Sequence, residues 1–127
     1  MTAIARFSLV ALDCPDHRLL ARFYSDITGW EIEPPTDDDS TEDDWVQLRA
    51  PGDGPTLAFQ RVPDHRPPVW PGNEHPQQAH LDFDVPDLDA AEARLLAVGA
   101  RRHELQPSEN WRVYLDPAGH PFCLVRV

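Results

Sequence analysis

An internal repeat constrains the fold of this chain more than any other sequence feature. Residues 80–87 read HLDFDVPD and residues 9–16 read LVALDCPD, so Asp84 aligns with Asp13 at an offset of 71 (84 minus 13). Each stretch begins as an alternating, strand-like run, ends in Pro-Asp and is followed by a helix-like segment. A repeat on this scale predicts a tandem architecture.

Later segments continue the match in the same order, which makes chance an unsatisfactory explanation. Residues 111–115 resemble residues 45–48, and residues 121–123 resemble residues 57–60, with Cys123 aligned to Gln60. We therefore predict an α+β fold of two βαβββ modules in pseudo-twofold tandem. A single domain over residues 1–127 would contain a first module at about 5–62, a Pro-rich connector at 63–77 and a second module at about 78–127.

In the first module, the pattern predicts a strand over residues 4–13 with Val10 and Leu12 on the face that a helix covers. Asp16 suits the N-cap of that helix, and Gly29 suits its C-terminal end. The apolar stripe expected to pack on the sheet is Leu19, Leu20, Phe23, Tyr24 and Ile27. We expect His17 and His103 to be exposed.

In the second module, Asp87 is the expected N-cap, and the helix stripe is predicted to be Leu88, Ala91, Leu95 and Val98, closed by Gly99. Leu81, Phe83 and Val85 should pack under this helix, whereas His80 and Asp82 should project from the opposite side of the strand. If two curved mixed sheets turn their helix-free faces together, those faces form a cleft. The candidate cleft residues are His80, Asp82, Leu9, Ala11, Gln60 and Cys123.

Charge and composition exclude several classes of function. The formal net charge is −11 and every basic side chain is Arg, so nucleic acid and anionic membranes are poor partners, and lysine chemistry is excluded. No run approaches the length of a membrane span or a signal peptide core, which favours a cytoplasmic protein. Cys14 and Cys123 lie in apolar runs and are expected to be buried free thiols.

Two segments outside the repeated elements allow alternatives. The acidic run at residues 37–44 fits either a solvated hairpin loop or an acidic lip that attracts a cationic ligand. Trp70, in the proline-rich connector, fits either a plug between the modules or a lid over a ligand.

The paired βαβββ plan, Phe23-Tyr24 before Gly29-Trp30, residues 80–82 (HLD) and residues 116–119 (DPAG) together resemble the vicinal oxygen chelate superfamily. That superfamily includes glyoxalase I, extradiol dioxygenases and the bleomycin resistance proteins, and the resemblance covers essentially the whole chain. It is greatest for glyoxalase-like members. The resemblance implies the fold, but the superfamily spans several chemistries.

In metal-dependent members, ligands come from the first and last strands of each module. The resemblance puts these positions at Leu9, His80, Gln60 and Cys123, of which His80 is the only strong metal ligand. Leu9 cannot coordinate a metal and Gln60 is a weak donor, so we predict no cofactor, with a divalent metal as the alternative. Asp82 is a possible substitute ligand.

Three functions follow. The first is a metal-independent cleft that binds a small aromatic or cationic molecule, with Trp45 and Tyr114 as additional candidate ligand-binding residues. The second is a lyase, isomerase or dioxygenase in which His80 holds a divalent ion. The third is a structural or regulatory dimer. Asp82 as a general base, and Cys123 with His80 as a nucleophilic pair, are further possibilities. The resemblance also implies a homodimer.

Overall fold

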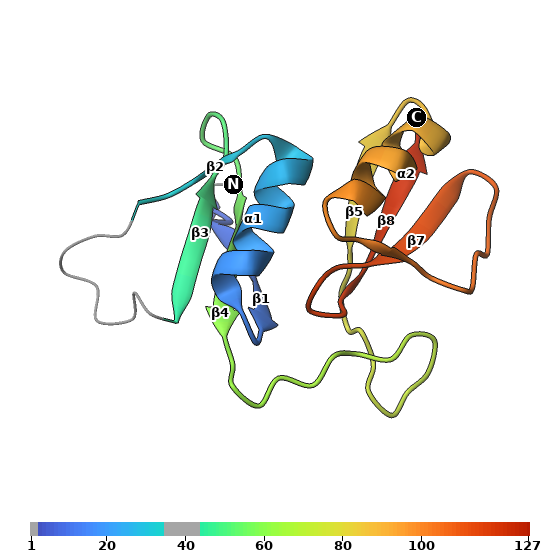
Figure 1. Cartoon of the computed structure of the whole chain (residues 1–127). Helices are drawn as coiled ribbons and strands as arrows, with labels where there is room; N and C mark the ends of the chain where they lie inside the picture. The colour runs from blue at the N-terminus through green and yellow to red at the C-terminus, as the bar shows by residue number, and fades with distance from the viewer. Residues whose placement is uncertain (1–2, 35–43) are drawn as a thin grey trace. The chain divides into compact units, whose positions relative to one another are not determined.

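The computed structural model describes residues 3–34 and 44–127. The chain divides into two compact units, Met1–His65 and Arg66–Val127. Each unit contains one four-stranded sheet and one helix (Figure 1). The acidic run that the sequence predicts as a loop lies outside the described residues, except for Asp44, which forms an exposed ion pair with Arg61.

The elements of the two units follow the same order. The first unit contains β1 (Leu9–Cys14), α1 (His17–Thr28), β2 (Glu31–Ile32), β3 (Trp45–Arg49) and β4 (Thr56–Arg61). The second contains β5 (Leu81–Val85), α2 (Leu88–Ala97), β6 (Arg101–Arg102), β7 (Trp111–Leu115) and β8 (Pro121–Arg126). The strand orders are β1-β4-β3-β2 and β5-β8-β7-β6, and in each sheet the first pair is parallel and the others are antiparallel. The predicted pair of βαβββ modules is confirmed.

Both helices begin at the predicted aspartates. The Asp16 carboxylate accepts the backbone N–H of Leu19, and the Asp87 carboxylate accepts that of Ala90, each at 3.1 Å. These bonds satisfy N–H groups that a helix start otherwise leaves unpaired. Helix α1 ends as expected at Gly29, whose φ of 74° is readily adopted by glycine.

The first strand and the helix stripes differ in part from the predictions. β1 begins at Leu9 rather than at residue 4, and Ile4 and Phe7 are exposed. Within β1 the predicted faces hold, because Val10 and Leu12 are partly buried while Ala11 and Asp13 are exposed. Leu19 and Val98, expected in the apolar stripes, are instead exposed.

The two histidines that we expected to be exposed are not. His17 retains only 6% of its accessible surface. His103 is half-buried, and its Nε2 lies 2.9 Å from the carbonyl oxygen of Trp70. Because the Leu105 backbone N–H donates to Nδ1 of a neutral His103, Nε2 carries the proton and donates it to Trp70.

The segment between β4 and β5 contains no helix or strand, as its prolines predict. From Arg66 onwards it belongs to the second unit. The Trp70 ring packs edge-on against the His103 ring at a centroid distance of 5.0 Å. Pro67 lies so close to Gly119 that a Cβ on Gly119 would be 2.6 Å from the Pro67 Cβ, so this turn requires glycine.

Among the described residues, no helix combines the length and apolar character needed to cross a membrane.

Candidate functional site

The second sheet has one face toward α2 and one face without a helix, and strand register assigns each residue to a face. Tyr114 pairs with Phe122 across β7 and β8, and the Tyr114 hydroxyl donates to Glu92 of α2 at 2.9 Å. That face therefore packs on the helix. Asp82 pairs with Cys123, and Cys123 pairs with Val113, so these three side chains share the opposite, helix-free face.

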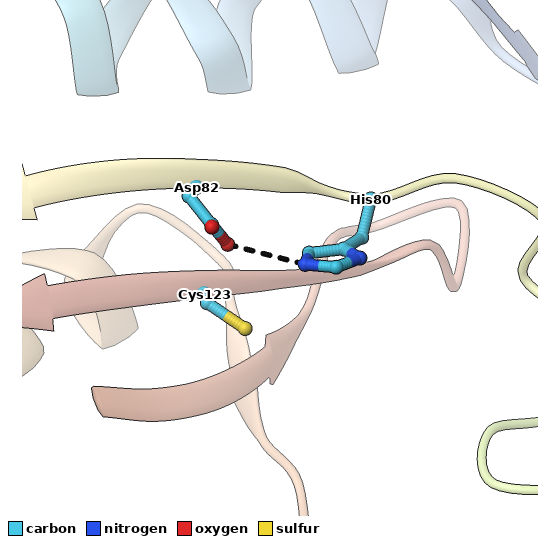
Figure 2. A group of neighbouring side chains, drawn as sticks. All are labelled: His80, Asp82 and Cys123. Carbon is cyan, nitrogen blue, oxygen red and sulfur yellow. Dashed lines mark ion pairs between the residues drawn. The ribbon is translucent and has the colours of Figure 1, made fainter. Parts of the chain in front are cut away.

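Three potential ligand groups meet on this helix-free face (Figure 2). His80, immediately before β5, places Nε2 3.3 Å from Oδ1 of Asp82. Cys123 projects from the neighbouring strand β8, and one ligand atom from each of the three residues lies within 4.8 Å of the others. The His80 and Asp82 side chains are 42% and 55% exposed, whereas Cys123 is buried. The cluster thus opens to solvent on its His80–Asp82 side.

The environment of Cys123 opposes a nucleophilic role. Burial, and then the negative charge and hydrogen bonding of Asp82, raise the pKa of the Cys123 thiol to about 11. A cysteine nucleophile instead needs a lowered pKa that populates the thiolate near neutral pH. Asp82 likewise lacks the burial that we expected of a general base, because more than half of its side chain is exposed.

Strand register changes the equivalence between the modules at their last strands. Ala11 pairs with Ala58 in the first sheet, while Asp82, 71 positions after Ala11, pairs with Cys123 in the second. Cys123 therefore corresponds to Ala58, and the predicted correspondence with Gln60 is wrong by two residues. A shift of two keeps a side chain on the same face, so Gln60 still projects from the helix-free face, but one pleat away.

The first unit carries no donor side chain at the positions equivalent to the three-residue cluster. The counterparts of His80, Asp82 and Cys123 are Leu9, Ala11 and Ala58. All three are apolar, and none can coordinate a metal. The chemical groups of the repeat are therefore concentrated in the second unit.

A tryptophan row is common to both sheets. In the first sheet Asp13 pairs with Gln60, which pairs with Trp45. In the second, Asp84 pairs with Val125, which pairs with Trp111. Both tryptophans are half-buried, both aspartates are exposed, and each row lies on the helix-free face of its sheet. The sequence analysis missed these aspartates as site residues, although the repeat itself aligns Asp13 with Asp84.

Tyr114 does not share the helix-free face. It is fully buried, its ring stacks on Phe122, and its hydroxyl is bonded to Glu92. The structure thus brings His80, Asp82 and Cys123 together, places Trp45 and Gln60 side by side in the first sheet, and assigns Tyr114 to the core. The sequence alone could not say which alternate residues of β7 face the helix.

A family model described as a glyoxalase-like domain matches residues 9–125. The chain belongs to the glyoxalase-like domain family. No curated protein sequence matches it.

Solved structures of glyoxalase-like proteins share the fold at low sequence identity. A glyoxalase family protein from Enterococcus faecalis is 19% identical, with a TM-score of 0.67 over 97% of this chain and 98% of that chain. A glyoxalase/bleomycin resistance protein/dioxygenase family enzyme from Burkholderia phytofirmans PsJN is 17% identical, with a TM-score of 0.66 over 97% and 99%. TnmS3, an antibiotic binding protein from Streptomyces sp. CB03234, is 20% identical, with a TM-score of 0.62 over 99% and 98%.

The residues of this glyoxalase-like chain only partly fit the metal site that the superfamily resemblance implies. The first-unit positions carry Leu9 and, at the last strand, Ala58 by register or Gln60 by sequence, and none of these is a strong ligand. The second unit offers an imidazole, a carboxylate and a thiol within 4.8 Å. The donor chemistry therefore does not match a set shared between the two modules, but does match a compact set within one.

Proposed function

We propose that this glyoxalase-like protein binds a small organic molecule, with a preference for aromatic cations, and does so without the superfamily's complete metal site. The observation that carries the proposal is the Asp–x–Trp row on the helix-free face of both sheets. Neighbouring strands lie about 4.8 Å apart, so each row spans roughly 10 Å from carboxylate to indole. That is the scale of a small aromatic ligand.

The chemistry of the row suits a cation. An indole face attracts an organic cation through its π electrons, and a carboxylate two strands away adds Coulomb attraction. The formal net charge of −11 favours cations over anions at longer range. The fold is also that of an antibiotic binding protein, TnmS3, which supports sequestration of a ligand as a role for this architecture.

Within this proposal the ligand contacts come from Trp45 and Gln60 in the first unit and from Trp111, His80 and Asp82 in the second. Each lies on or beside a helix-free sheet face and has exposed or half-buried surface. Cys123 contributes from the floor of its cluster, where it is buried. Tyr114 is not part of the binding surface.

Calorimetric titration of chelator-treated protein tests the proposal. Suitable probes are metal-free bleomycin, because related structures carry its name, and aromatic cations paired with neutral aromatics of equal size. We expect saturable binding that favours the cations and weakens about tenfold in Trp45→Ala or Trp111→Ala. Trp30→Ala, outside the rows, is the matched control. Unchanged affinity in both row variants would refute the role of the rows.

A metal-dependent lyase, isomerase or dioxygenase is the second candidate, and the His80–Asp82–Cys123 cluster favours it. A metal at a hundred times its dissociation constant would stabilise the fold by about 2.7 kcal/mol. Thermal unfolding with and without Zn²⁺, Ni²⁺, Mn²⁺ or Fe²⁺ should then show a rise in Tm that His80→Ala abolishes. Unchanged melting with every ion would count against this candidate.

We further propose a cytoplasmic homodimer, from the superfamily resemblance. Light scattering after size exclusion should give twice the 14.4 kDa mass of the chain. A mass of one chain across the micromolar range would exclude it.

A further inference from the structure

The cluster formed by His80, Asp82 and Cys123 has a composition that selects among metals. It combines one nitrogen, one oxygen and one sulfur donor, all from the second unit. A thiolate is a soft ligand that favours zinc and related ions, whereas magnesium, calcium and manganese prefer sites made of oxygen alone. The presence of Cys123 therefore favours a thiophilic cation.

The spacing of the donors fits a small tetrahedral ion. Zinc binds nitrogen and oxygen at about 2.0–2.2 Å and sulfur at about 2.3 Å, so ligand atoms in a tetrahedral site lie roughly 3.3–3.8 Å apart. His80 Nε2 and Asp82 Oδ1 are already 3.3 Å apart, and no pair in the cluster exceeds 4.8 Å. Side-chain movement of about 1 Å would bring all three into range.

The backbone fixes two of the three donors relative to each other. Asp82 and Cys123 are direct partners in the parallel pairing of β5 with β8, and His80 lies two residues before Asp82 on the same side. Figure 2 shows His80 and Asp82 directed toward each other above the Cys123 sulfur. Donors held by a sheet need less ordering to bind an ion than donors on loops.

We propose that His80, Asp82 and Cys123 form a three-ligand site for a thiophilic divalent cation of the zinc class, contained within the second unit. The exposed His80–Asp82 side leaves a fourth position open to water or to a small ligand. Cys123 loses its proton to the solvent when the ion binds. The site differs from one shared between modules because Leu9, Ala11 and Ala58 contribute nothing to it.

The proposal stands apart from binding of an organic molecule, because that binding is measured on chelated protein and this site is measured with the metal alone. Full-length protein is stripped with a chelator and dialysed against Zn²⁺, and bound zinc is then determined by plasma mass spectrometry. We expect one ion per chain, with affinity reduced at least tenfold in Cys123→Ser and in His80→Ala. Cys14→Ala, which removes the only other thiol, should bind zinc like the parent chain.

Cobalt substitution tests the thiolate directly. Co²⁺ bound by Cys123 should give a sulfur-to-metal charge-transfer band in the near ultraviolet that Cys123→Ser lacks and Cys14→Ala retains. If Cys123→Ser does not fold, Asp82→Asn replaces it, since that side chain is more than half exposed, and it should lower zinc affinity at least tenfold. Equal zinc binding in the folded ligand variants, or a cobalt complex without the band, would overturn the proposal.

Discussion

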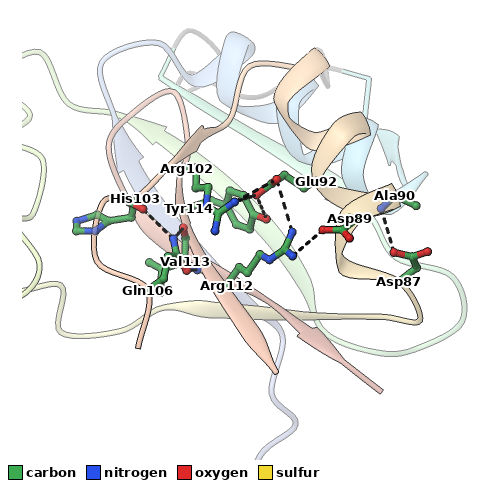
Figure 3. A network of polar contacts seen from close by, with 10 residues as sticks. All are labelled: Asp87, Asp89, Ala90, Glu92, Arg102, His103, Gln106, Arg112, Val113 and Tyr114. Carbon is green, nitrogen blue, oxygen red and sulfur yellow. Dashed lines mark hydrogen bonds and ion pairs between the residues drawn. The ribbon is translucent and has the colours of Figure 1, made fainter. Parts of the chain in front are cut away.

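The two units of this protein share one backbone plan but join helix to sheet by different chemistry. In the first, α1 packs through aromatic rings: Tyr24 stacks on Phe59 at 5.5 Å and meets Phe23 edge-on at 5.0 Å, all of them buried. In the second, α2 is joined to β7 by charged groups (Figure 3). A repeat in sequence therefore preserves topology without preserving the interactions that stabilise it.

The polar joint of the second unit centres on Glu92. Its carboxylate accepts the Tyr114 hydroxyl at 2.9 Å and lies 3.2 Å from Arg102 and 3.5 Å from Arg112. Arg112 also donates to Asp89 at 2.7 Å, an interaction that raises the pKa of the Arg112 guanidinium. The helix-free faces differ in the same direction, because only the second unit carries the His80–Asp82–Cys123 cluster.

Removing the aromatic joint should have the largest effect. Phe59→Ala deletes a fully buried ring and is expected to cost about 3–5 kcal/mol of unfolding free energy, measured by urea denaturation. Leu124, which occupies the equivalent position in β8, provides the comparison. Leu124→Ala should cost no more than Phe59→Ala. A loss below about 1.5 kcal/mol in Phe59→Ala would show that the first unit does not depend on this joint.

The second unit should be sensitive to alkali through Tyr114. Burial, and then the hydrogen bond and charge of Glu92, raise the pKa of Tyr114 from 10.0 to about 12. Because the folded pKa is raised, the stabilisation is complete below pH 10 and is lost as pH rises toward 12. A shift of about two pKa units corresponds to on the order of 2–3 kcal/mol. Unfolding free energies across this range should fall less in Tyr114→Phe, and identical profiles would contradict the assignment.

Neutralising Glu92 should weaken the polar joint by a smaller amount. Glu92→Gln keeps the side-chain shape but removes the charge that faces Arg102 and Arg112, and we expect a loss of about 1–3 kcal/mol in urea denaturation. Glu104→Gln, at an exposed position, is the control and should stay within about 0.5 kcal/mol of the parent. Equal effects in the two variants would mean that the network contributes nothing beyond surface charge.

The first unit should instead respond to acid, with the smallest effect of the four. Burial and the nearby Arg18 and Arg61 lower the pKa of His17 below 6.5, although Asp16 and Asp44 act in the opposite direction. With a lowered folded pKa, the unfolded chain takes up the proton first, so stability falls as pH decreases below 6.5.

Chemical denaturation between pH 7 and 5 should show this decrease in the parent chain and a weaker one in His17→Leu. His75→Gln, at an exposed position, serves as the control and should follow the parent chain. A parent profile that is flat over this interval would contradict the role of His17.

Local signals in the sequence were sufficient for most of the fold. Asp16 and Asp87 as helix N-caps, and Gly29 as a helix end, depend on neighbouring residues alone and are confirmed. The burial of His17 depends on tertiary packing, so its position after an N-cap gave no sign of it. Loops of unequal length hid the correspondence of Cys123 with Ala58, which only strand pairing revealed.

The candidate site was predicted in part for the same reason. Alternation along β5 correctly put His80 and Asp82 on the side opposite the helix, because period-two patterns are local. The direct pairing of Asp82 with Cys123 and the assignment of Tyr114 to the core are properties of register between strands distant in sequence.

The most direct test of the proposed function is calorimetric titration of the chelator-treated protein with metal-free bleomycin and with the aromatic cation series. We predict saturable binding in the absence of any metal, about tenfold weaker in Trp45→Ala or Trp111→Ala and unchanged in Trp30→Ala. Binding that appears only after Zn²⁺ is restored, or no binding to any probe, would contradict a metal-independent binding protein.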